Sequence, residues 1–269
     1  MKIKCEHEVM KQVTKDEDII PMISIMPPAM LAFRFIMKCQ DVVTMDHVLK
    51  ADYNIKLLTP YVERYIREKE EYLGKIYFVS IPNTSMSLIK KKFREYNLRY
   101  GCTTGLYDTF KLDINEGMSD NHWISLIKDS RELHELAMKY SMKMIATMQC
   151  AIATQGQLFL DASILSNSKA VKEILENLYL VRNMYPEEMD ENNKKYYCRP
   201  YRLEKIGDKW IEKKVELKKE HTYKVLFLDK FRSGENSESN NYAVVLKFDG
   251  SHGTVSEYCL CRPRRGKIQ

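Results

Sequence analysis

The sequence lacks any long apolar run. None of its 269 residues lies in a stretch that approaches the roughly 18 consecutive apolar residues of a membrane-spanning helix. The first residues, Met-Lys-Ile-Lys-Cys-Glu, also lack the apolar core of a secretory signal peptide. The length and the 44% apolar composition permit one large hydrophobic core or two modest ones. We therefore expect a cytoplasmic protein with no membrane partner.

Patterns typical of metal sites and disulfide frameworks are absent as well. The seven cysteines include no C-x-x-C pair, and Cys259 and Cys261 form a single C-x-C whose side chains share one face of a strand. The six histidines are scattered, and His134-Glu135 is not followed by the second histidine of a zinc-protease helix. These absences argue against a zinc site and predict reduced, mostly structural thiols.

Charged residues of both signs are plentiful. The sequence has 43 Lys and Arg against 37 Asp and Glu, which gives a formal net charge of +6. The resulting pI is about 8.7. Such a mild basic excess permits an anionic partner but does not require one, because most of these charges form a solvated surface.

Apolar strand-like runs alternate with amphipathic helical stretches up to about residue 182. The expected strands are 22–26, 76–81, 106–110, 143–148 and 178–182. The expected helices are 29–39, 59–73, 85–99, 119–141 and 168–176. Three later strands, 223–229, 242–249 and 254–260, have no helices between them. The pattern predicts an α/β fold with a mostly parallel sheet flanked by helices, ending in antiparallel β-hairpin strands.

Two segments interrupt this pattern within 185–222. The stretch 186–195 is first acidic and then basic, and it is poor in apolar residues, which predicts a mobile loop. Ile206-Gly207-Asp208-Lys209 lies between two short strand-like runs, which predicts a small hairpin. Neither segment has the size of a domain, so we expect 1–269 to form a single domain with an insertion at 185–222.

Two polar residues lie where apolar strands end. Asp108 follows the apolar pair Leu106-Tyr107, and Gln149 follows the apolar run 144–148. P-loop proteins place at such a strand end the carboxylate that holds the water shell of a nucleotide-bound magnesium ion. Open α/β sheets bind ligands at the carboxyl ends of their strands. The alternative for Asp108 is an ordinary helix cap or turn residue.

The order of these elements strengthens the first interpretation. The strand with Asp108 precedes a helix that contains Ser-Arg-Glu-Leu-His-Glu-Leu-Ala at 130–137, and the strand ending at Gln149 comes next. Asp-Lys-Phe-Arg-Ser-Gly follows at 229–234. This succession resembles the RecA-like motor domain of the DnaB-like replicative DNA helicases of superfamily 4, most closely the phage-encoded members. The resemblance covers about 22–260.

The resemblance implies roles for individual residues. Asp108 matches the Walker B aspartate, which holds magnesium through water, and Gln149 matches the glutamine that couples nucleotide state to the DNA-binding loop. Lys230, Arg232 and Gly234 match the family's K-x-R-x-G, whose basic residues reach the γ-phosphate of ATP bound to the neighbouring subunit. Without the family context, Lys230 and Arg232 would equally suit an exposed turn before a β-hairpin.

The resemblance also implies partners. Two DNA-contacting loops correspond to 111–118 and 150–160, with Lys111, Gln155 and Gln157 as candidate DNA-binding residues. Family members use ATP and Mg²⁺, encircle single-stranded DNA as a homo-oligomeric ring, expected to be a hexamer, and work with a primase or a loader. For a phage-encoded member, the cytoplasm is that of the host.

A phosphate-binding loop is missing from the sequence. The Gly-Lys pairs, Gly74-Lys75 and Gly266-Lys267, are each followed by isoleucine instead of the Ser or Thr of G-x-x-x-x-G-K-[ST]. In the family, the P-loop strand and helix precede the strand that 22–26 resembles. We therefore expect an N-terminally truncated motor domain that begins just after these elements, with 9–17 as a remnant of the P-loop helix.

The catalytic base is missing too. The family has a glutamate just after its second strand, where this sequence reads Ser-Ile-Met-Pro-Pro at 24–28, and Met26 cannot polarise a water molecule. Arg34 matches an arginine of the following helix, so the alignment register is consistent. The two departures predict little ATPase activity for this chain by itself.

Three interpretations remain open on the sequence. The leading one is a helicase motor domain that couples ATP hydrolysis to translocation on single-stranded DNA during replication. The second is a non-catalytic ring component, or a fragment that needs a partner chain bearing the P-loop. The third is an unrelated α/β binding protein in which Asp108 and Gln149 are ordinary residues at the end of a sheet.

Overall fold

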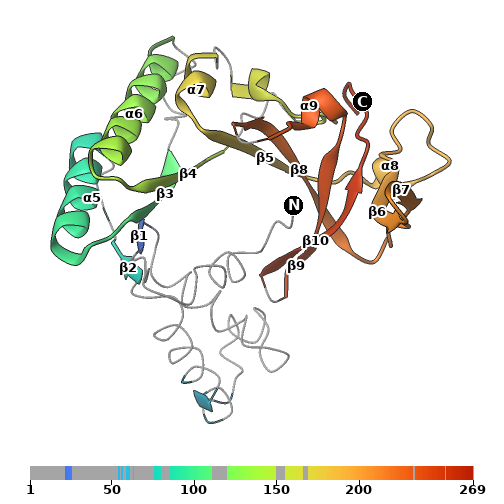
Figure 1. Ribbon diagram of the computed structural model, residues 1–269, viewed down its shortest axis with the longest axis horizontal. Helices are drawn as coiled ribbons and strands as arrows, with labels where there is room; N and C mark the ends of the chain where they lie inside the picture. The colour runs from blue at the N-terminus through green and yellow to red at the C-terminus, as the bar shows by residue number, and fades with distance from the viewer. Residues whose placement is uncertain are drawn as a thin grey trace. The chain divides into compact units, whose positions relative to one another are not determined.

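The computed structural model describes two compact units of the chain (Figure 1). The described residues are 22–25, 54, 56, 59–60, 63, 76–79, 81, 85–110, 120–149, 155–165, 169–232, 234–251 and 253–268. The first unit contains the described residues up to Gln149, and the second contains 155–249 and 255–268. The helix expected at 29–39 and most of the one expected at 59–73 lie outside the described residues.

The first unit contains a parallel sheet with strand order β2-β1-β3-β4. Its strands are β1 (Met22–Ile25), β2 (Ile76–Phe78), β3 (Thr104–Phe110) and β4 (Lys143–Met148). Helices α5 (Met86–Tyr100) and α6 (Asp120–Lys139) precede and follow β3. Each of the three strand pairs is parallel. The parallel sheet predicted for these four segments is therefore confirmed.

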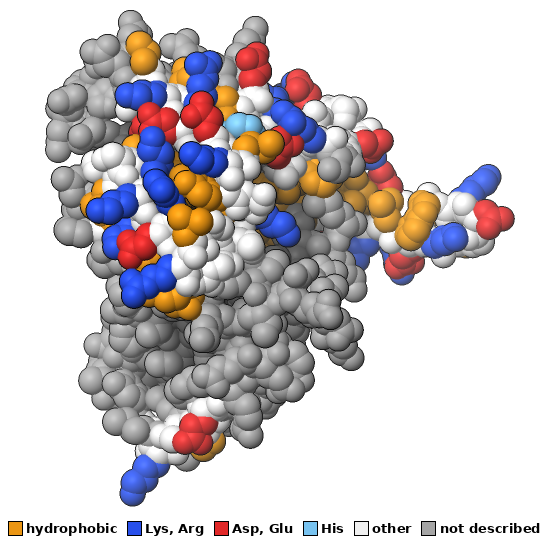
Figure 2. Space-filling view, turned by 60° about the vertical axis from the view of Figure 1, so that its left-hand side comes forward, with side chains coloured by type: hydrophobic (Ala, Val, Ile, Leu, Met, Phe, Trp, Pro, Cys, Tyr) orange, Lys and Arg blue, Asp and Glu red, His pale blue; other side chains and the backbone are white. Residues whose placement is uncertain are grey.

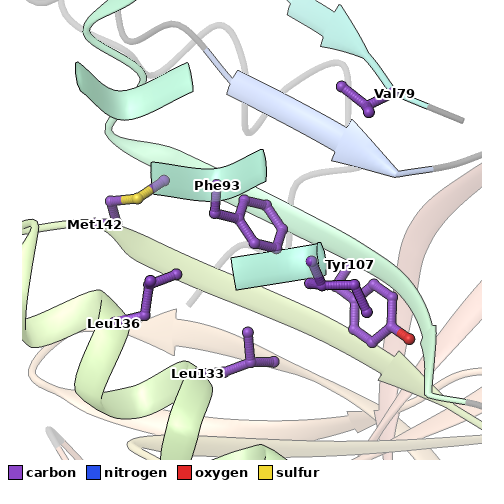
Figure 3. Packing of buried hydrophobic residues seen from close by; sticks show 7 residues of the cluster. Val79, Phe93, Tyr107, Leu133, Leu136 and Met142 are labelled. Carbon is purple, nitrogen blue, oxygen red and sulfur yellow. The ribbon is translucent and has the colours of Figure 1, made fainter. Parts of the chain in front are cut away.

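The apolar stripes of α5 and α6 pack against the sheet. Figure 3 shows that side chains of α5, α6 and β3 point toward one another in this core. The cluster consists of Val79, Ile89, Phe93, Tyr107, Leu133, Leu136 and Met142. Gly101 ends α5 in the left-handed region with φ of 68°, and its N–H donates to the carbonyl oxygen of Asn97 at 2.9 Å. This turn directs the chain from α5 into β3.

Gly105 lets β3 lie close to α5. A Cβ atom at this position would lie 2.7 Å from both the Met144 sulfur and the Cε1 atom of the fully buried Phe93 ring. We expect Gly105→Ala to lower the free energy of unfolding by about 1–3 kcal/mol, measured by urea denaturation, because the ring has no space to move. Adding Met144→Ala should return part of the loss. An unchanged unfolding midpoint in Gly105→Ala would contradict this packing.

The second unit contains a six-stranded sheet with strand order β5-β8-β9-β10-β6-β7. The strands are β5 (Asn177–Asn183), β6 (Pro200–Ile206), β7 (Lys209–Lys214), β8 (Thr222–Phe231), β9 (Ala243–Asp249) and β10 (Thr254–Cys261). Pairings β5–β8, β8–β9, β10–β6 and β6–β7 are antiparallel. The antiparallel ending of the fold is thereby confirmed. The short helices are α7 (Lys169–Ile174), α8 (Pro186–Met189) and α9 (Ser237–Asn240), with a 3₁₀ turn at Ala162–Leu165.

The expectation that 178–182 belongs to the parallel sheet is wrong, because this segment lies in β5 and pairs antiparallel with β8. Leu178 and Leu180 are buried, whereas Tyr179 and Val181 are each 46% exposed. A strand with one covered and one solvent-facing side suits an antiparallel sheet, while strands inside parallel sheets are covered on both sides.

Of the two predictions for the segments within 185–222, the structure confirms the hairpin and differs at the loop. The hairpin predicted around Gly207 is confirmed, because β6 and β7 pair across Gly207 and Asp208. The loop predicted at 186–195 instead begins with the helical turn α8. Glu188 in α8 is fully buried and forms an ion pair with Arg182 at 2.6 Å. A charge partner from β5 therefore anchors a segment whose composition alone indicated a loop.

The four described cysteines are free and buried: Cys102, Cys198, Cys259 and Cys261. Burial raises the pKa of the Cys102 thiol to about 11. Burial is also the largest cause that raises the pKa of the Cys259 thiol to about 12. A hydrogen bond with Cys198, followed by burial, raises the pKa of Cys261. The prediction of structural thiols is confirmed for these four. Among the described residues, no helix is long and apolar enough to span a membrane.

Candidate nucleotide site

Asp108 and Gln149 lie toward the carboxyl ends of two neighbouring parallel strands. Asp108 is in β3, two residues before its end, and Gln149 directly follows β4. Tyr107 is aligned with Ala146, and an irregularity then shifts the register before Phe110 pairs with Met148. The Thr147 hydroxyl donates a hydrogen bond to Oδ1 of Asp108.

The strand geometry explains the position of the carboxylate. Successive side chains of a strand point to opposite faces. Tyr107 is buried in the core with α5 and α6, and burial is the largest cause that raises the pKa of its hydroxyl. Asp108 does not belong to that core; it is partly buried and bonds to Thr147 of β4, while Gln149 is exposed. The sequence pattern indicated Asp108 and Gln149 but missed Thr147, whose role depends on the strand register.

The site offers one carboxylate, one hydroxyl and one amide. Among the residues that the structure describes, no group of three or more His, Cys, Asp or Glu side chains could hold a metal ion. A single carboxylate fits a hydrated Mg²⁺ held mainly by nucleotide phosphates, because Mg²⁺ keeps several of its waters. Asp108 is the residue of this group that could hold such an ion.

Lys230 and Arg232 contact the end of α7 in their own unit. Lys230 Nζ donates to the carbonyl oxygens of Lys172 and Glu173, the latter at 3.2 Å. Burial is the largest cause that lowers the pKa of Lys230, and the charge of Arg232 adds to it. Lys230 thus satisfies carbonyl groups that the helix end leaves without partners.

Arg232 follows β8 and is more accessible. Its guanidinium forms an ion pair with Glu176 at 2.8 Å, and the two side chains are 55% and 53% exposed. Gly234 lies beside Phe231, and a Cβ at Gly234 would lie 2.9 Å from that ring. The segment after β8 is therefore a close turn with an accessible cation.

Asp229 is a buried acid that sequence reasoning missed. Its side chain accepts a hydrogen bond from the Ala162 N–H at 3.0 Å and forms an ion pair with Lys172 at 2.8 Å. Asp229 is 3% exposed. The signal in the sequence is a carboxylate inside the apolar run of β8. It links β8 to both α7 and the 3₁₀ turn.

The candidate DNA-binding residues lie in different settings. Lys111 is outside the described residues, as are 111–118 and the first part of 150–160. Gln155 is exposed. Gln157 is half-buried and forms an isolated antiparallel bridge with Lys267. Among the described residues, its Oε1 atom is buried without a hydrogen-bond partner.

A basic hollow lies between α5 and α6. Figure 2 brings this face of the first unit forward and shows Lys and Arg side chains gathered on it. The hollow has a volume of about 400 Å³, and its charged lining comprises Lys90, Lys91, Arg94, Lys139, Glu132 and Glu135. Lys90 pairs with Glu132 at 2.5 Å. The excess of cations gives this face a positive character.

Two solved structures with a similar fold are an ATPase domain and a replicative helicase. The sequence matches no protein-family model and no curated protein. One solved ATPase domain is similar with a TM-score of 0.59 and 13% identity, over 89% of this chain and 74% of that chain. A DnaB-like replicative helicase, whose structure addresses its interactions with primase, is similar with a TM-score of 0.59 and 15% identity.

That second similarity covers 92% of this chain but 52% of the helicase, so the chain spans about half of its length. At sequence identities this low, the structural similarity establishes only the fold, and the function has to be argued from the residues of the site. The chain is therefore an α/β protein whose fold is similar to that of the ATPase domains of DnaB-like replicative helicases.

Proposed function

We propose that this chain is the motor domain of a DnaB-like DNA helicase, or a separate part of one, that couples ATP hydrolysis to translocation on single-stranded DNA during replication. The observation that carries the proposal is the placement of Asp108 and Thr147 on neighbouring parallel strands, with Gln149 directly after the second strand. This placement occurs in a fold similar to those of helicase ATPase domains. Open α/β sheets bind ligands at the carboxyl ends of their strands, which is where these residues lie.

Each residue has a defined task in the proposal. Asp108, oriented by Thr147, holds the water shell of the magnesium ion that accompanies ATP. Gln149 transmits the nucleotide state to the chain that follows β4. Arg232, whose side chain is exposed, completes the site of a neighbouring subunit in a ring, expected to be hexameric, and Lys230 joins it there by leaving the carbonyl oxygens of α7. The two units belong to one motor domain, phage-type in character, with primase or a loader as further partners.

DNA contacts form the second half of the proposal. Lys111, Gln155 and Gln157 contact single-stranded DNA, with phosphates bound mainly by cations and backbone N–H groups. The basic face of α5 and α6 supports an anionic partner.

A second candidate is a chain that needs a partner segment to supply the phosphate-binding loop. The exposure of β4 favours it. Within the described residues, β4 pairs only with β3, and Ile145 is 52% exposed. Helices normally cover both faces of a parallel sheet. A further segment bearing the loop, with the strand and helix that flank the loop in the family, would pair with the free edge of β4, cover Ile145 and bring phosphate close to Asp108 and Gln149.

Phosphate release from Mg²⁺–ATP tests both candidates. We expect the purified chain to release little more phosphate than its Asp108→Ala variant, because it lacks a phosphate cradle and a catalytic glutamate. The assembly that contains this chain should hydrolyse ATP in a DNA-dependent manner and lose this activity with Asp108→Ala. Robust hydrolysis by the chain alone would rule out the second candidate. An assembly that is indifferent to Asp108→Ala would contradict the motor.

A further inference from the structure

The β6–β7 hairpin exposes an unusual amount of apolar side chain. All six residues of β7 are exposed, and β7 is the edge strand of its sheet. Leu203 and Ile211 are each 47% exposed, Ile206 is 61% exposed and Trp210 is 65% exposed. Large apolar groups gathered on one exposed element are typical of an interaction surface.

The tip of the hairpin pairs each of two apolar groups with a lysine. The turn at Gly207, with φ of 62°, is followed by Asp208 and sets the strand register. Lys205 is opposite Trp210, and Ile206 is opposite Lys209. Residues directly opposite in an antiparallel pair share one face. Each face of the tip therefore presents one apolar side chain and one cation.

The acidic side chains of the hairpin strands are already neutralised. Glu204 pairs with Lys213 at 3.0 Å, and Glu212 pairs with Arg262. Lys205 and Lys209 are exposed and form no ion pair with any described residue. Asp208, in the turn, is the remaining acid at the tip, so the unpaired charge there is positive.

We propose that the tip of this hairpin binds single-stranded nucleic acid. Trp210 stacks on an unpaired base, while Lys205, opposite Trp210 on the same face of the hairpin, contacts a neighbouring phosphate. An indole ring offers a stacking platform to any base, and lysines add a sequence-independent attraction to the backbone. Duplex DNA keeps its bases stacked inside the helix, so an indole at an exposed tip selects single strands. This surface is separate from the nucleotide site and works without hydrolysis.

Fluorescence anisotropy with labelled oligothymidylate, without nucleotide, tests the proposal on the full chain. We expect Trp210→Ala to weaken binding by on the order of 10-fold, because one stacking contact is lost. Trp210→Phe should retain much of the affinity and lose the quenching of tryptophan fluorescence seen in the unaltered chain. Ile211→Ala, on the same exposed strand but without a stacking face, is the matched control and should bind normally.

The salt dependence of the affinity tests the role of the lysines. Lys205→Gln should reduce the slope of log affinity against log salt by about 0.7, the contribution of one phosphate contact on a single strand, whereas Lys209→Gln, on the other face, should leave the slope unchanged. Normal binding by Trp210→Ala, equal affinity for duplex DNA, or no oligonucleotide binding by the unaltered chain would overturn the proposal. Equal losses in Trp210→Ala and Ile211→Ala would also overturn it, because Ile211 has no stacking face. Asp108→Ala should leave all these values unchanged, which separates this test from that of the motor.

Discussion

Replacing Arg232 with alanine is expected to lower ATP hydrolysis by the assembly that contains this chain by on the order of 10³-fold. A guanidinium supplied by a neighbouring subunit stabilises the charge that develops on the transferred phosphoryl group, and its loss removes that stabilisation. Arg232 suits this task because its side chain is 55% exposed and its ion pair with Glu176 is also exposed. Exposed pairs contribute at most about 1 kcal/mol, so Arg232 can leave Glu176 for a phosphate at little cost.

Glu176→Ala is the matched control for Arg232→Ala, because both variants lose the same ion pair. If Arg232 acts on phosphate, Glu176→Ala should retain hydrolysis while Arg232→Ala loses it. Equal effects of the two variants would assign Arg232 a structural role at the end of α7.

Mixing subunits tests whether Arg232 acts across an interface. Arg232→Ala and Asp108→Ala subunits each retain the half of the site that the other lacks. Mixed assemblies should therefore recover some hydrolysis, since some interfaces carry both intact halves. A mixture as inactive as either variant alone would leave the ring mechanism unsupported.

Replacing Arg182 with methionine is expected to lower the free energy of unfolding by about 3–5 kcal/mol, because a buried carboxylate would lose its cation. Glu188 is fully buried, and the Arg182 side chain is 9% exposed. The two form a bidentate pair with N–O distances of 2.6 and 2.7 Å. Urea denaturation followed by circular dichroism measures the effect.

The surroundings of Arg182 explain why the loss should be large. Its guanidinium also donates to the carbonyl oxygens of Leu158 and of Asn183, the latter at 3.0 Å. It lies over the rings of Tyr185 and Phe227, with centroid distances of 5.1 and 5.5 Å. One side chain thus joins β5, α8, β8 and the segment at 158.

Two further variants separate the charge from the packing. Arg182→Met with Glu188→Gln should recover roughly 1–3 kcal/mol relative to Arg182→Met, because a neutral amide is less costly to bury than a carboxylate. Arg202→Met, which removes an exposed arginine that bonds to the Tyr258 carbonyl, should cost less than about 1.5 kcal/mol. Equal losses in Arg182→Met and Arg202→Met would contradict the buried pair.

Local patterns in the sequence were sufficient for most of the described elements. The strand predicted at 143–148 has these bounds in the structure, and the helices predicted at 85–99 and 119–141 appear as Met86–Tyr100 and Asp120–Lys139. Apolar periodicity predicts such elements because one face of each must be buried. Gly207-Asp208 predicts its hairpin because glycine accepts the positive φ of the turn at little cost.

The same patterns located part of the candidate site. Asp108 and Gln149 each end an apolar run, and parallel strands bring their carboxyl ends to one edge, so two separate signals predicted one place. Whether the side chains there act on a nucleotide is a matter of chemistry that the strand pattern leaves open.

Contacts between distant segments came from the folded chain alone. The antiparallel pairing of β5 with β8, the burial of Glu188 against Arg182 and the contact of Lys230 with the end of α7 join residues that no local pattern connects. The Thr147–Asp108 bond likewise depends on the register of two strands. In the sequence, Glu188 is one acid among the polar residues of 186–195. Its burial is possible only because the fold places the Arg182 guanidinium beside it. Because the partner of a charge is chosen by the packing of whole strands and helices, that choice follows from tertiary structure and not from local sequence.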